Sequence, residues 1–332
     1  MKLALIAALA APVLLLAACG KPAKTTTPEV LNFSILSAED QQSMSRVWQP
    51  LLDDLQKQTG LKVKAFYATN YTSLIEAMRF NQVQAGWFSA LPSLEAVNRA
   101  NGEVLGRIVS GDGTVTYESV LIVGKDSKIT LDDVLKCGKR YDFGIGDPRS
   151  TSGTLAPNYY LFGPRKIEPA DCFKTVRSAS HQANLGAVAN GVLNVATNNT
   201  EGLLFAERNA PEIRAKVKVI WTSPPLPESA ILVRKDLDAD VKAKLKTFFS
   251  TYGSAQGAEG EHERKVLKAL TYSGIRPAGD DYLDPIRLMV AADDLNRARR
   301  SGDPGKIAAA QAAFDAVKAL AASRAKPADA HG

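Results

Sequence analysis

The fold is decided by the stretch 144–160, which reads GIGDPRSTSGTLAPNYY. An apolar segment precedes the glycine-rich turn and predicts a strand, and Ser150 predicts the start of a helix. A helix start presents unpaired N–H groups and about half a positive charge. Ser150, Thr151 and Ser152 add hydroxyl donors there, and Gly153 lets a ligand approach the backbone. The stretch therefore predicts a receptor for a tetrahedral oxyanion; the alternative is an ordinary helix start capped by one serine.

The same stretch lacks the motifs of nucleotide binding. Gly144 and Gly146 begin a G-x-G pattern, but Arg149 stands where a dinucleotide fingerprint has its third glycine. The chain also contains no G-x-x-x-x-G-K-[ST] motif. We therefore expect no nucleotide cofactor, and no other cofactor is indicated.

Strands and helices alternate on both sides of this stretch, which predicts an α/β fold with mixed or parallel sheets. We expect strands at 31–36, 61–66, 85–88, 117–123, 141–145, from 175, 192–196, 217–221 and 230–233. We expect helices at 37–58, 73–80 (capped by Ser73 and Glu76), 92–102, 184–190 and 241–251, and others beginning at Thr130, Ser150 and Pro285.

The last helix carries one apolar stripe at helical spacing, formed by Ile307, Ala310, Phe314, Val317 and Ala321. The stripe predicts packing of this helix on its own domain; the alternative is a helix that binds a partner.

Two polar groups follow predicted strands. His181 lies at the end of a predicted strand. An isolated histidine usually has only a structural role, with its hydrogen bonds satisfied inside the fold. The segment 197–201 reads TNNTE and predicts a loop. Loops at strand ends are where α/β proteins place ligand contacts.

The N-terminus predicts export. Lys2 precedes the uncharged apolar run 3–16, and two alanines then precede Cys19. The run is too short for a comfortable membrane span and has the layout of a secretory signal. Its end resembles the lipobox of bacterial lipoproteins, which implies cleavage after residue 18, lipid on Cys19 and a flexible tether over 19–30. The alternative is an ordinary signal peptide.

The composition excludes several protein classes. The 332 residues suggest two domains, and the net charge of +6 is spread along the chain without a basic block, which argues against nucleic-acid binding. Three Cys and three His are too few for zinc clusters, and no metal site is expected. Cys137 and Cys172 both precede predicted strands, so a disulfide between them is plausible in an oxidising compartment; two free thiols are the alternative.

Five segments together match a known family: YTSLIEAMRFN at 71–81, SVLIV at 119–123, GDPRSTSG at 146–153, AVAN at 187–190 and ATNNTE at 196–201. Through them the chain resembles the periplasmic phosphonate-binding proteins of ABC transporters, within the wider group that binds phosphate, phosphite and phosphonate. The resemblance covers about residues 31–287.

The resemblance implies a two-lobed periplasmic binding protein of type II, a clamshell with mixed central sheets and the ligand between the lobes. Lobe 1 would comprise 31–120 and 226–295, and lobe 2 would comprise 121–225. The helical extension and tail at 296–332 follow.

The resemblance also implies seven ligand-binding side chains. Ser150, Thr151 and Ser152 would hold the phosphonate oxygens, together with backbone N–H groups of the helix start, and His181 would donate to the same group. Tyr71 and Tyr117 would reach in from lobe 1. Glu201 matches an acid that pairs with the ligand amine in binders of aminoalkylphosphonates.

The chain departs from the family pattern in two places. A second acid is expected after the proline of the strand that returns to lobe 1, but Ser229 occupies its place and Glu228 precedes it. The aromatic pair expected near Trp87 is also changed, because the chain reads WFSA at 87–90. Both departures concern the amine end of the site and leave the oxyanion end unchanged.

The expected function is that of a periplasmic, lipid-anchored solute-binding protein that delivers a phosphonate, with 2-aminoethylphosphonate as a candidate, to an ABC transporter permease. The alternatives are a phosphite or phosphate receptor of the same family and a ligand-sensing lipoprotein. A phosphonate-processing enzyme is disfavoured, because there is no metal-binding motif such as H-E-x-x-H and no nucleophile–base set around His181.

Overall fold

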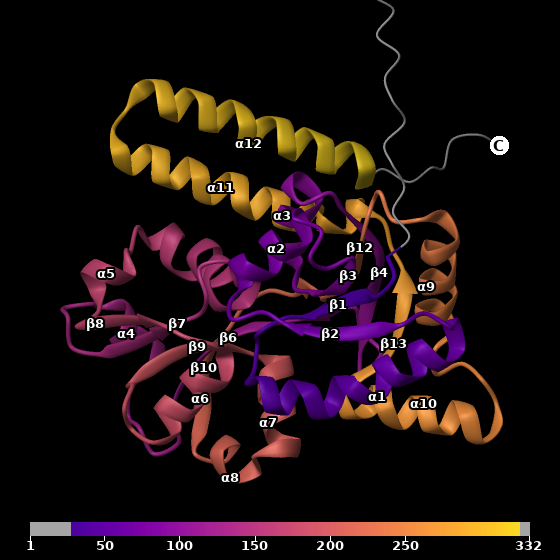
Figure 1. The fold of residues 1–332 in the computed structure, drawn as a ribbon. Helices are drawn as coiled ribbons and strands as arrows, with labels where there is room; N and C mark the ends of the chain where they lie inside the picture. Colours follow the sequence, from indigo (N-terminus) through magenta and orange to yellow (C-terminus); the bar gives the residue numbers. More distant parts are fainter. Residues whose placement is uncertain (1–27, 326–332) are drawn as a thin grey trace, which may run out of the picture.

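The computed structural model describes residues 28–325 (Figure 1). The predicted signal peptide, Cys19 and most of the tether lie outside these residues, as does the end of the tail. Among the described helices, none has both the length and the apolar character that a bilayer span requires.

Two large sheets form the centres of two lobes, and the predicted two-lobed α/β architecture with mixed sheets is confirmed. Lobe 1 is used here for the part built on the six-stranded sheet. Its strand order is β13 (Tyr272–Pro277), β4 (Gly102–Ser110), β12 (Ala230–Arg234), β3 (Ala85–Phe88), β1 (Leu31–Ile35) and β2 (Val63–Tyr67). The strands β1, β2 and β3 are parallel, and β12, β4 and β13 are joined by antiparallel pairing.

Lobe 2 is the part built on the five-stranded sheet. Its strand order is β10 (Val217–Thr222), β6 (Ser119–Gly124), β9 (Val195–Asn199), β7 (Asp142–Ile145) and β8 (Thr175–Ser178). The strands β7, β8 and β9 are parallel, so the segments that follow them meet at one edge of the sheet.

The chain passes between the lobes on two short paired strands. It leaves lobe 1 through β5 (Thr116–Tyr117) and returns through β11 (Leu226–Pro227), which pairs antiparallel with β5. These two crossings lie beside the cavity described below.

Helices cover the sheets. Those of lobe 1 are α1 (Gln41–Thr59), α2 (Tyr71–Arg79), α3 (Ala90–Arg99), α9 (Ala239–Thr251) and α10 (Gly257–Ala269). Those of lobe 2 are α4 (Leu131–Leu135), α5 (Pro169–Cys172), α6 (His181–Ala189), α7 (Thr200–Asn209) and α8 (Pro211–Arg214). Lobe 1 has one large core cluster, whereas lobe 2 has a smaller cluster on each side of its sheet.

The structure contains several elements that the sequence did not predict, and it corrects the predicted class or start of others. The strands β4 and β13 and the helix α10 were not expected, and Gly102, where the helix beginning at Pro92 was expected to end, is the first residue of β4. The segment 197–201 is not a loop but the end of β9 and the first turn of α7. The helix α2 begins at Tyr71 and its cap is Asn70, which exchanges hydrogen bonds with Ser73.

The predicted helix at Ser150 is present, but its backbone is wider than an α-helix. Ser150 is the cap, and Thr151–Leu155 (η1) and Pro157–Phe162 (η2) form π-helical turns that end in the 3₁₀ turn Gly163–Arg165 (η3). Turns of the π type are rare and often occur at functional sites.

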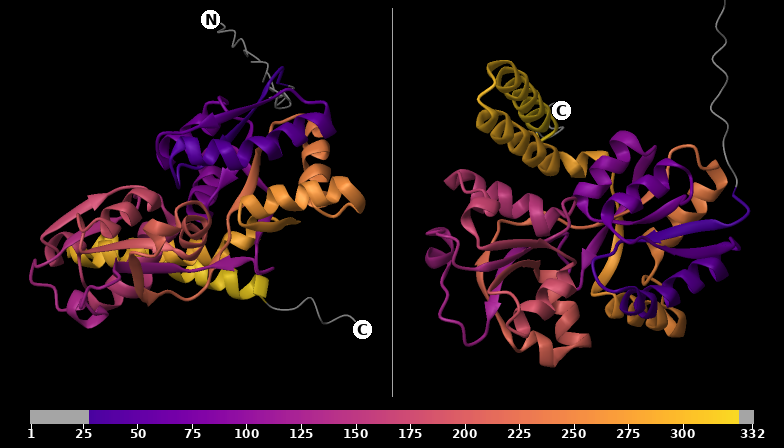
Figure 2. Two further views of the ribbon diagram at one scale, coloured as in Figure 1. Left: turned by 90° about the horizontal axis from the view of Figure 1, so that it is seen from below. Right: turned by 60° about the vertical axis from the view of Figure 1, so that its left-hand side comes forward.

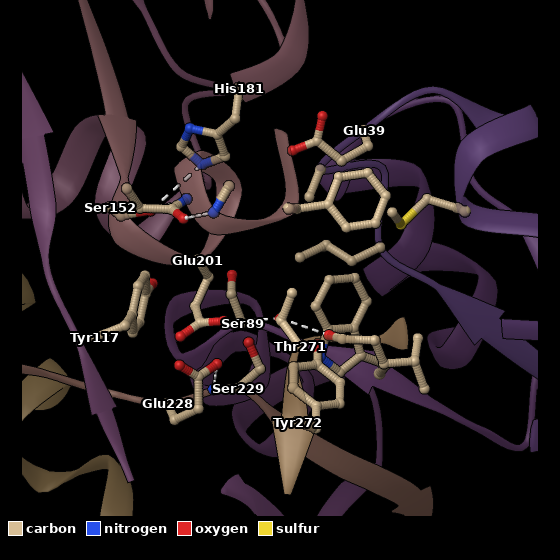
Figure 3. Close-up of a pocket in the computed structure, with 18 of the residues that line it drawn as sticks. Glu39, Ser89, Tyr117, Ser152, His181, Glu201, Glu228, Ser229, Thr271 and Tyr272 are labelled. Carbon is tan, nitrogen blue, oxygen red and sulfur yellow. Dashed lines mark hydrogen bonds between the residues drawn. The ribbon is translucent and has the colours of Figure 1, made fainter. Parts of the chain in front are cut away.

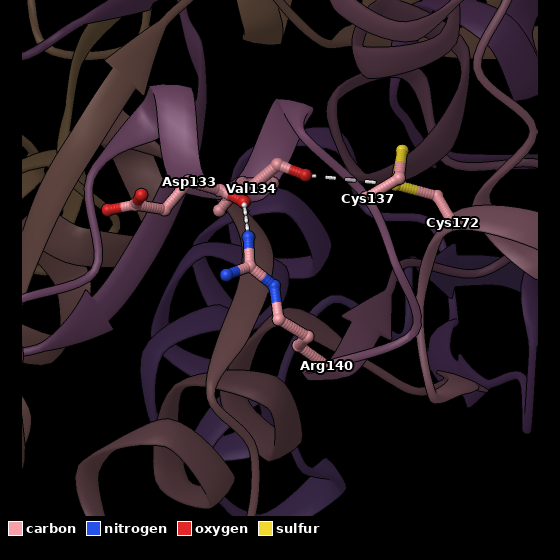
Figure 4. The surroundings of a disulfide bond; sticks show 5 residues. All are labelled: Asp133, Val134, Cys137, Arg140 and Cys172. Carbon is pink, nitrogen blue, oxygen red and sulfur yellow. Dashed lines mark hydrogen bonds between the residues drawn. A yellow bond between two sulfur atoms is a disulfide. The ribbon is translucent and has the colours of Figure 1, made fainter.

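Cys137 and Cys172 form a disulfide bond, as predicted (Figure 4). They precede β7 and β8, which are neighbouring parallel strands, and the Lys139 N–H donates to the Cys172 carbonyl at 2.9 Å. The bond therefore fastens the two segments that enter this side of the lobe 2 sheet.

The C-terminal helices form a hairpin that lies along both lobes (Figures 1 and 2). A 3₁₀ turn, Asp280–Leu283 (η4), leads into α11 (Asp284–Ser301), which packs on α3 of lobe 1 and on the π-helical turns of lobe 2. Near its end, Arg300 pairs with Glu168 of lobe 2 at 2.9 Å. The helix α12 (Pro304–Ala325) packs along α11 with the half-buried stripe Ile307, Ala310, Phe314, Val317 and Ala321.

Candidate functional site

A cavity lies between the two lobes and beside the crossing strands (Figure 3). It offers about 70 Å³ to the centres of water molecules. Of the seven predicted ligand-binding residues, six line it: Tyr71, Tyr117, Ser150, Ser152, His181 and Glu201. None of its lining residues is Lys or Arg.

One end of the cavity, called here the hydroxyl end, is formed by Ser150, Ser152 and His181. The hydroxyl oxygens of Ser150 and Ser152 each lie 3.3 Å from His181 Nε2. The Ser150 hydroxyl also accepts the Gly153 N–H at 2.9 Å. The Ser152 hydroxyl accepts from Asn199 Nδ2 at 3.1 Å, so Asn199, a member of the polar segment 197–201, orients this serine.

Two glycines bring the backbone of this end together. The Gly146 N–H donates to the Gly153 carbonyl at 3.0 Å. A β-carbon on Gly146 would lie 2.5 Å from the Gly153 α-carbon, and one on Gly153 would lie 2.8 Å from the Gly146 α-carbon. Both distances are shorter than a non-bonded carbon pair allows, so the turn requires glycine at both positions.

Thr151 does not line the cavity. Its side chain is buried, and its hydroxyl accepts the Leu91 N–H of lobe 1 at 2.8 Å. The middle hydroxyl of the Ser-Thr-Ser run therefore ties the two lobes together, because successive side chains at a helix start point in different directions.

His181 is the first residue of α6 and is neutral in this site. Burial lowers the pKa of its imidazole to about 4. Its Nδ1 is buried and has no hydrogen-bond partner among the described residues. A neutral imidazole is both a donor and an acceptor, so Nε2 can donate to an oxyanion when it carries the proton.

Tyr71 and Tyr117 close the sides of the cavity. Tyr71 is the first residue of α2, and Tyr117 lies on the crossing strand β5. Burial raises the pKa of both phenols above their ordinary value, so both keep their hydroxyl protons. Each can therefore donate a hydrogen bond to an anion.

The other end of the cavity, called here the carboxyl end, is formed by Glu201, Glu228 and Thr271. Glu201 Oε2 accepts from the Thr271 hydroxyl at 2.8 Å, which joins lobe 2 to lobe 1. Burial raises the pKa of Glu201 and, together with the charge of Glu201, raises the pKa of Glu228 to about 7.

The structure shows what replaces the acid that the family pattern expects at position 229. Ser229 lines the cavity at the expected acid's place, and the adjacent Glu228 lines it as well. Glu228 Oε1 accepts the Ser229 N–H at 2.8 Å. The cavity thus keeps two carboxyl groups at this end although the family position holds a serine. Trp87 and Ser89 also line the cavity, whereas Phe88 does not.

A third acid, Glu39, lines the cavity from lobe 1 and was missed by the sequence reasoning. It follows the parallel strand β1, and positions after parallel strands are where α/β folds place ligand contacts, so a signal was present. No cluster of three or more His, Cys, Asp or Glu side chains within residues 28–325 is placed to hold a metal ion.

Direct contacts hold the lobes closed around the cavity. Besides Thr271–Glu201 and Thr151–Leu91, Arg149 pairs with Glu95 at 2.6 Å. A cavity enclosed by two lobes, with neutral donors at one end and carboxyl groups at the other, can hold a small anion that carries a cation some atoms away.

The family model and the related sequences that match this chain describe similar kinds of protein. The model of the periplasmic phosphonate substrate-binding protein of ABC transporters matches residues 33–283. The phosphonates-binding periplasmic protein of Escherichia coli (strain K12) is 43% identical over 268 residues, covering 80% of this chain and 78% of that protein. A phosphate-import protein of Mycolicibacterium smegmatis is 27% identical over 274 residues, covering 77% and 84%.

A solved structure agrees with these sequence relatives. The binding protein component of an ABC phosphonate transporter from Pseudomonas aeruginosa superposes with a TM-score of 0.84 and 37% identity, covering 90% of this chain and 99% of that one. These relatives are transport substrate-binding proteins and not enzymes. The chain belongs to the family of periplasmic phosphonate substrate-binding proteins of ABC transporters.

Proposed function

We propose that this protein binds a small phosphonate between its lobes and delivers it to an ABC transporter permease, and that 2-aminoethylphosphonate is its preferred ligand. The observation that carries the proposal is the division of one cavity into a hydroxyl end and a carboxyl end without a basic side chain.

The hydroxyl end suits a phosphonate head. Such a head has three acceptor oxygens and one to two negative charges. The hydroxyls of Ser150, Ser152, Tyr71 and Tyr117 and His181 Nε2 supply directional neutral donors, and backbone N–H groups at the helix start add to them. The proposed role of Thr151 is to hold this end against lobe 1.

The carboxyl end suits an amine. Glu228 is buried and Glu201 is half-buried, and neither forms an ion pair with a described cation. An ammonium group would neutralise them, whereas a second anion would be repelled. A zwitterion with phosphonate and amine at opposite ends satisfies both ends at once.

The cavity size favours a short ligand. About 70 Å³ of the cavity is open to the centres of water molecules, which is room for a small ligand in an enclosed space. 2-Aminoethylphosphonate is a small ligand of this kind. Ligand contacts to both lobes would stabilise the closed form over the open one, and closure would be the signal read by the permease.

Residues 1–27 lie outside the described structure, so membrane attachment is a separate part of the proposal. Lipid on Cys19 would tether the mature protein to the membrane near the permease. Incorporation of labelled palmitate into the wild type but not into Cys19→Ala is the expected result, and equal labelling would disprove the anchor.

The function is tested by calorimetric titration with 2-aminoethylphosphonate, methylphosphonate, phosphite and phosphate, using the wild type and Glu201→Gln. We expect the variant to bind 2-aminoethylphosphonate about tenfold or more weakly, since a hydrogen bond to a charged group contributes about 1.5–3 kcal/mol. Methylphosphonate, which has no amine, should change little.

The matched control is Glu207→Gln, because Glu207 is exposed on the same helix. Equal losses for both phosphonates would show that Glu201 does not contact an amine. Preference of the wild type for phosphate or phosphite would favour the alternative that the Mycolicibacterium relative represents.

A further inference from the structure

Ser89 stands at the start of α3 and lines the ligand cavity from lobe 1 (Figure 3). Its side chain is buried, and its backbone has the extended conformation of a helix cap, with φ −72° and ψ 166°. A serine at this position ordinarily accepts an N–H of the first helical turn through its side chain. The Ser89 side chain accepts no such N–H here, so another group must serve the start of α3.

Lobe 2 supplies the cap that Ser89 does not provide. Pro92, the third residue of α3, has no N–H, so Leu91 carries the N–H that a side-chain cap can accept. The Leu91 N–H donates to the Thr151 hydroxyl at 2.8 Å. Because this bond joins residues of different lobes, it is lost when the lobes separate.

The hydroxyls of Thr151 and Ser89 form a short chain that leads to the cavity. The Thr151 hydroxyl accepts from Leu91 and donates to Ser89 Oγ at 3.4 Å. The Ser89 oxygen is therefore an acceptor, and its own proton has no acceptor among the residues that the structure describes. An anion is the acceptor that such a chain favours, because every bond in it points toward the anion and polarises the next.

Ser89 lies beside the hydroxyl end of the cavity. Its partner Thr151 stands between Ser150 and Ser152 in the sequence, and these two serines line the same cavity as Ser89. No basic side chain lines this cavity, so the oxygens of a phosphonate head depend on neutral donors. Ser89 can add one more donor to this set, and it comes from lobe 1.

We propose that Ser89 is a ligand-binding residue that becomes available through an exchange of caps on α3. In the open protein the Ser89 hydroxyl accepts the Leu91 N–H. On closure the Thr151 hydroxyl accepts this N–H instead, and Ser89 donates its proton to the oxyanion. Ser89 is then a contact residue, and Thr151 is a positioning residue that acts through it. The inference rests on the proposed binding of phosphonates between the lobes.

The exchange links ligand binding to closure. A ligand that accepts from Ser89 makes this contact only in the closed form, so the contact favours closure. The contact concerns the oxyanion alone, and phosphonates with and without an amine should depend on it equally. One hydrogen bond to a charged group corresponds to a roughly ten- to hundredfold change in affinity.

The test is calorimetric titration of 2-aminoethylphosphonate and methylphosphonate into the wild type and four variants. The variants are Ser89→Ala, Thr151→Val, Thr151→Ser and the double variant Ser89→Ala/Thr151→Val. The matched control is Ser34→Ala, which removes another buried hydroxyl of lobe 1 that does not line the cavity. Denaturant unfolding shows whether each variant is folded.

We expect Ser89→Ala to bind both phosphonates roughly ten- to hundredfold more weakly, with their preference unchanged, and Ser34→Ala to bind like the wild type. Thr151→Val should show a loss of the same order, and Thr151→Ser, which keeps the hydroxyl, should bind nearly as well as the wild type. Because Thr151 acts through Ser89, the loss in the double variant should be smaller than the product of the two single losses.

Wild-type affinity in Ser89→Ala would overturn the proposal while leaving phosphonate binding established. Single losses that multiply in the double variant would also overturn it, because Thr151 would then act independently of Ser89. If neither phosphonate binds the wild type, the proposed function itself fails.

Crystal structures of the wild type give a second test that needs no variant. In the methylphosphonate complex, Ser89 Oγ should lie within about 3.2 Å of a phosphonate oxygen. In the open protein without ligand, Ser89 Oγ should accept the Leu91 N–H. A complex in which Ser89 Oγ lies beyond hydrogen-bond distance of the phosphonate, or an open form in which Leu91 is not capped by Ser89, would overturn the exchange.

Discussion

The two ends of the cavity are built in different ways. The hydroxyl end takes both of its serines from one tight turn after β7, and the adjacent histidine begins α6 after the neighbouring strand β8. The carboxyl end takes Glu201 from lobe 2 and both Glu228 and Thr271 from the side of lobe 1. The hydroxyl end can therefore exist in an open protein, whereas the carboxyl end is complete only when the lobes meet.

This difference separates two tasks. A preformed set of donors provides affinity for any oxyanion of suitable size, because little ordering is needed when the ligand arrives. Acids gathered by closure act on the choice between ligands, because they make contact only in the closed form.

The largest effect is expected from the double variant Ser150→Ala/Ser152→Ala. Loss of two hydrogen bonds to a charged head, at about 1.5–3 kcal/mol each, should weaken every phosphonate by roughly 10²- to 10⁴-fold. Calorimetry measures the change. Thr151→Ala serves for comparison and should lose less, because the Thr151 hydroxyl does not line the cavity and instead accepts the Leu91 N–H and donates to the Ser89 hydroxyl. Equal losses in both variants would show that the hydroxyl end acts only as a structural turn.

The next effect is expected from removing the disulfide with Cys137→Ser/Cys172→Ser. The bond closes a loop of 35 residues in the lobe whose cores are small, and the loop-entropy model gives it about 4 kcal/mol of stability. Denaturant unfolding should show the loss. Hydrogen exchange should speed up in β7 and β8, which support the hydroxyl end, and not in β1 and β3. Uniform acceleration would mean that the two lobes do not unfold separately.

A smaller effect is expected for Glu228→Gln in the empty protein. Burial raises the pKa of Glu228 from 4.5 to about 7, so the folded protein holds a proton in a pH range where the unfolded chain has lost it. Wild-type stability therefore decreases as the pH rises from 4.5 to 7, by up to about 3 kcal/mol through this group. The variant lacks this decrease.

Denaturant unfolding from pH 4 to pH 9 measures the difference between the two proteins. The stability of Glu228→Gln relative to the wild type should rise across the window and level off above it, and Glu207→Gln should give a flat difference. A flat difference for Glu228→Gln would mean that the carboxyl end is hydrated in the empty protein.

The extent to which the site could be predicted follows the same division. Ser150 and Ser152 are close in the sequence, and the chemistry of a helix start identified them before any tertiary contact was considered. Thr151 was assigned the same role, but the direction in which its hydroxyl points depends on the turn geometry and on the Leu91 N–H of the other lobe. Glu39 and Asn199 gain their positions only through packing between elements that are distant in the sequence.

The fold shows the same limit. Alternating apolar segments predicted most strands of both sheets, whereas β4 was missed because its glycines interrupt the pattern and its stability comes from pairing with β12 and β13 on either side. The disulfide was predictable, because parallel neighbours bring their entering segments to the same edge.

The backbone contact between Gly146 and Gly153 has a consequence for how this receptor can be altered. A substitution at either glycine forces the two backbone segments apart, so mutant libraries aimed at new ligands should spare this turn. Randomising the residues opposite this turn would change which phosphorus compound is preferred, while the groups that bind the oxyanion stay in place. The protein is therefore a practical starting point for biosensors of several phosphorus compounds.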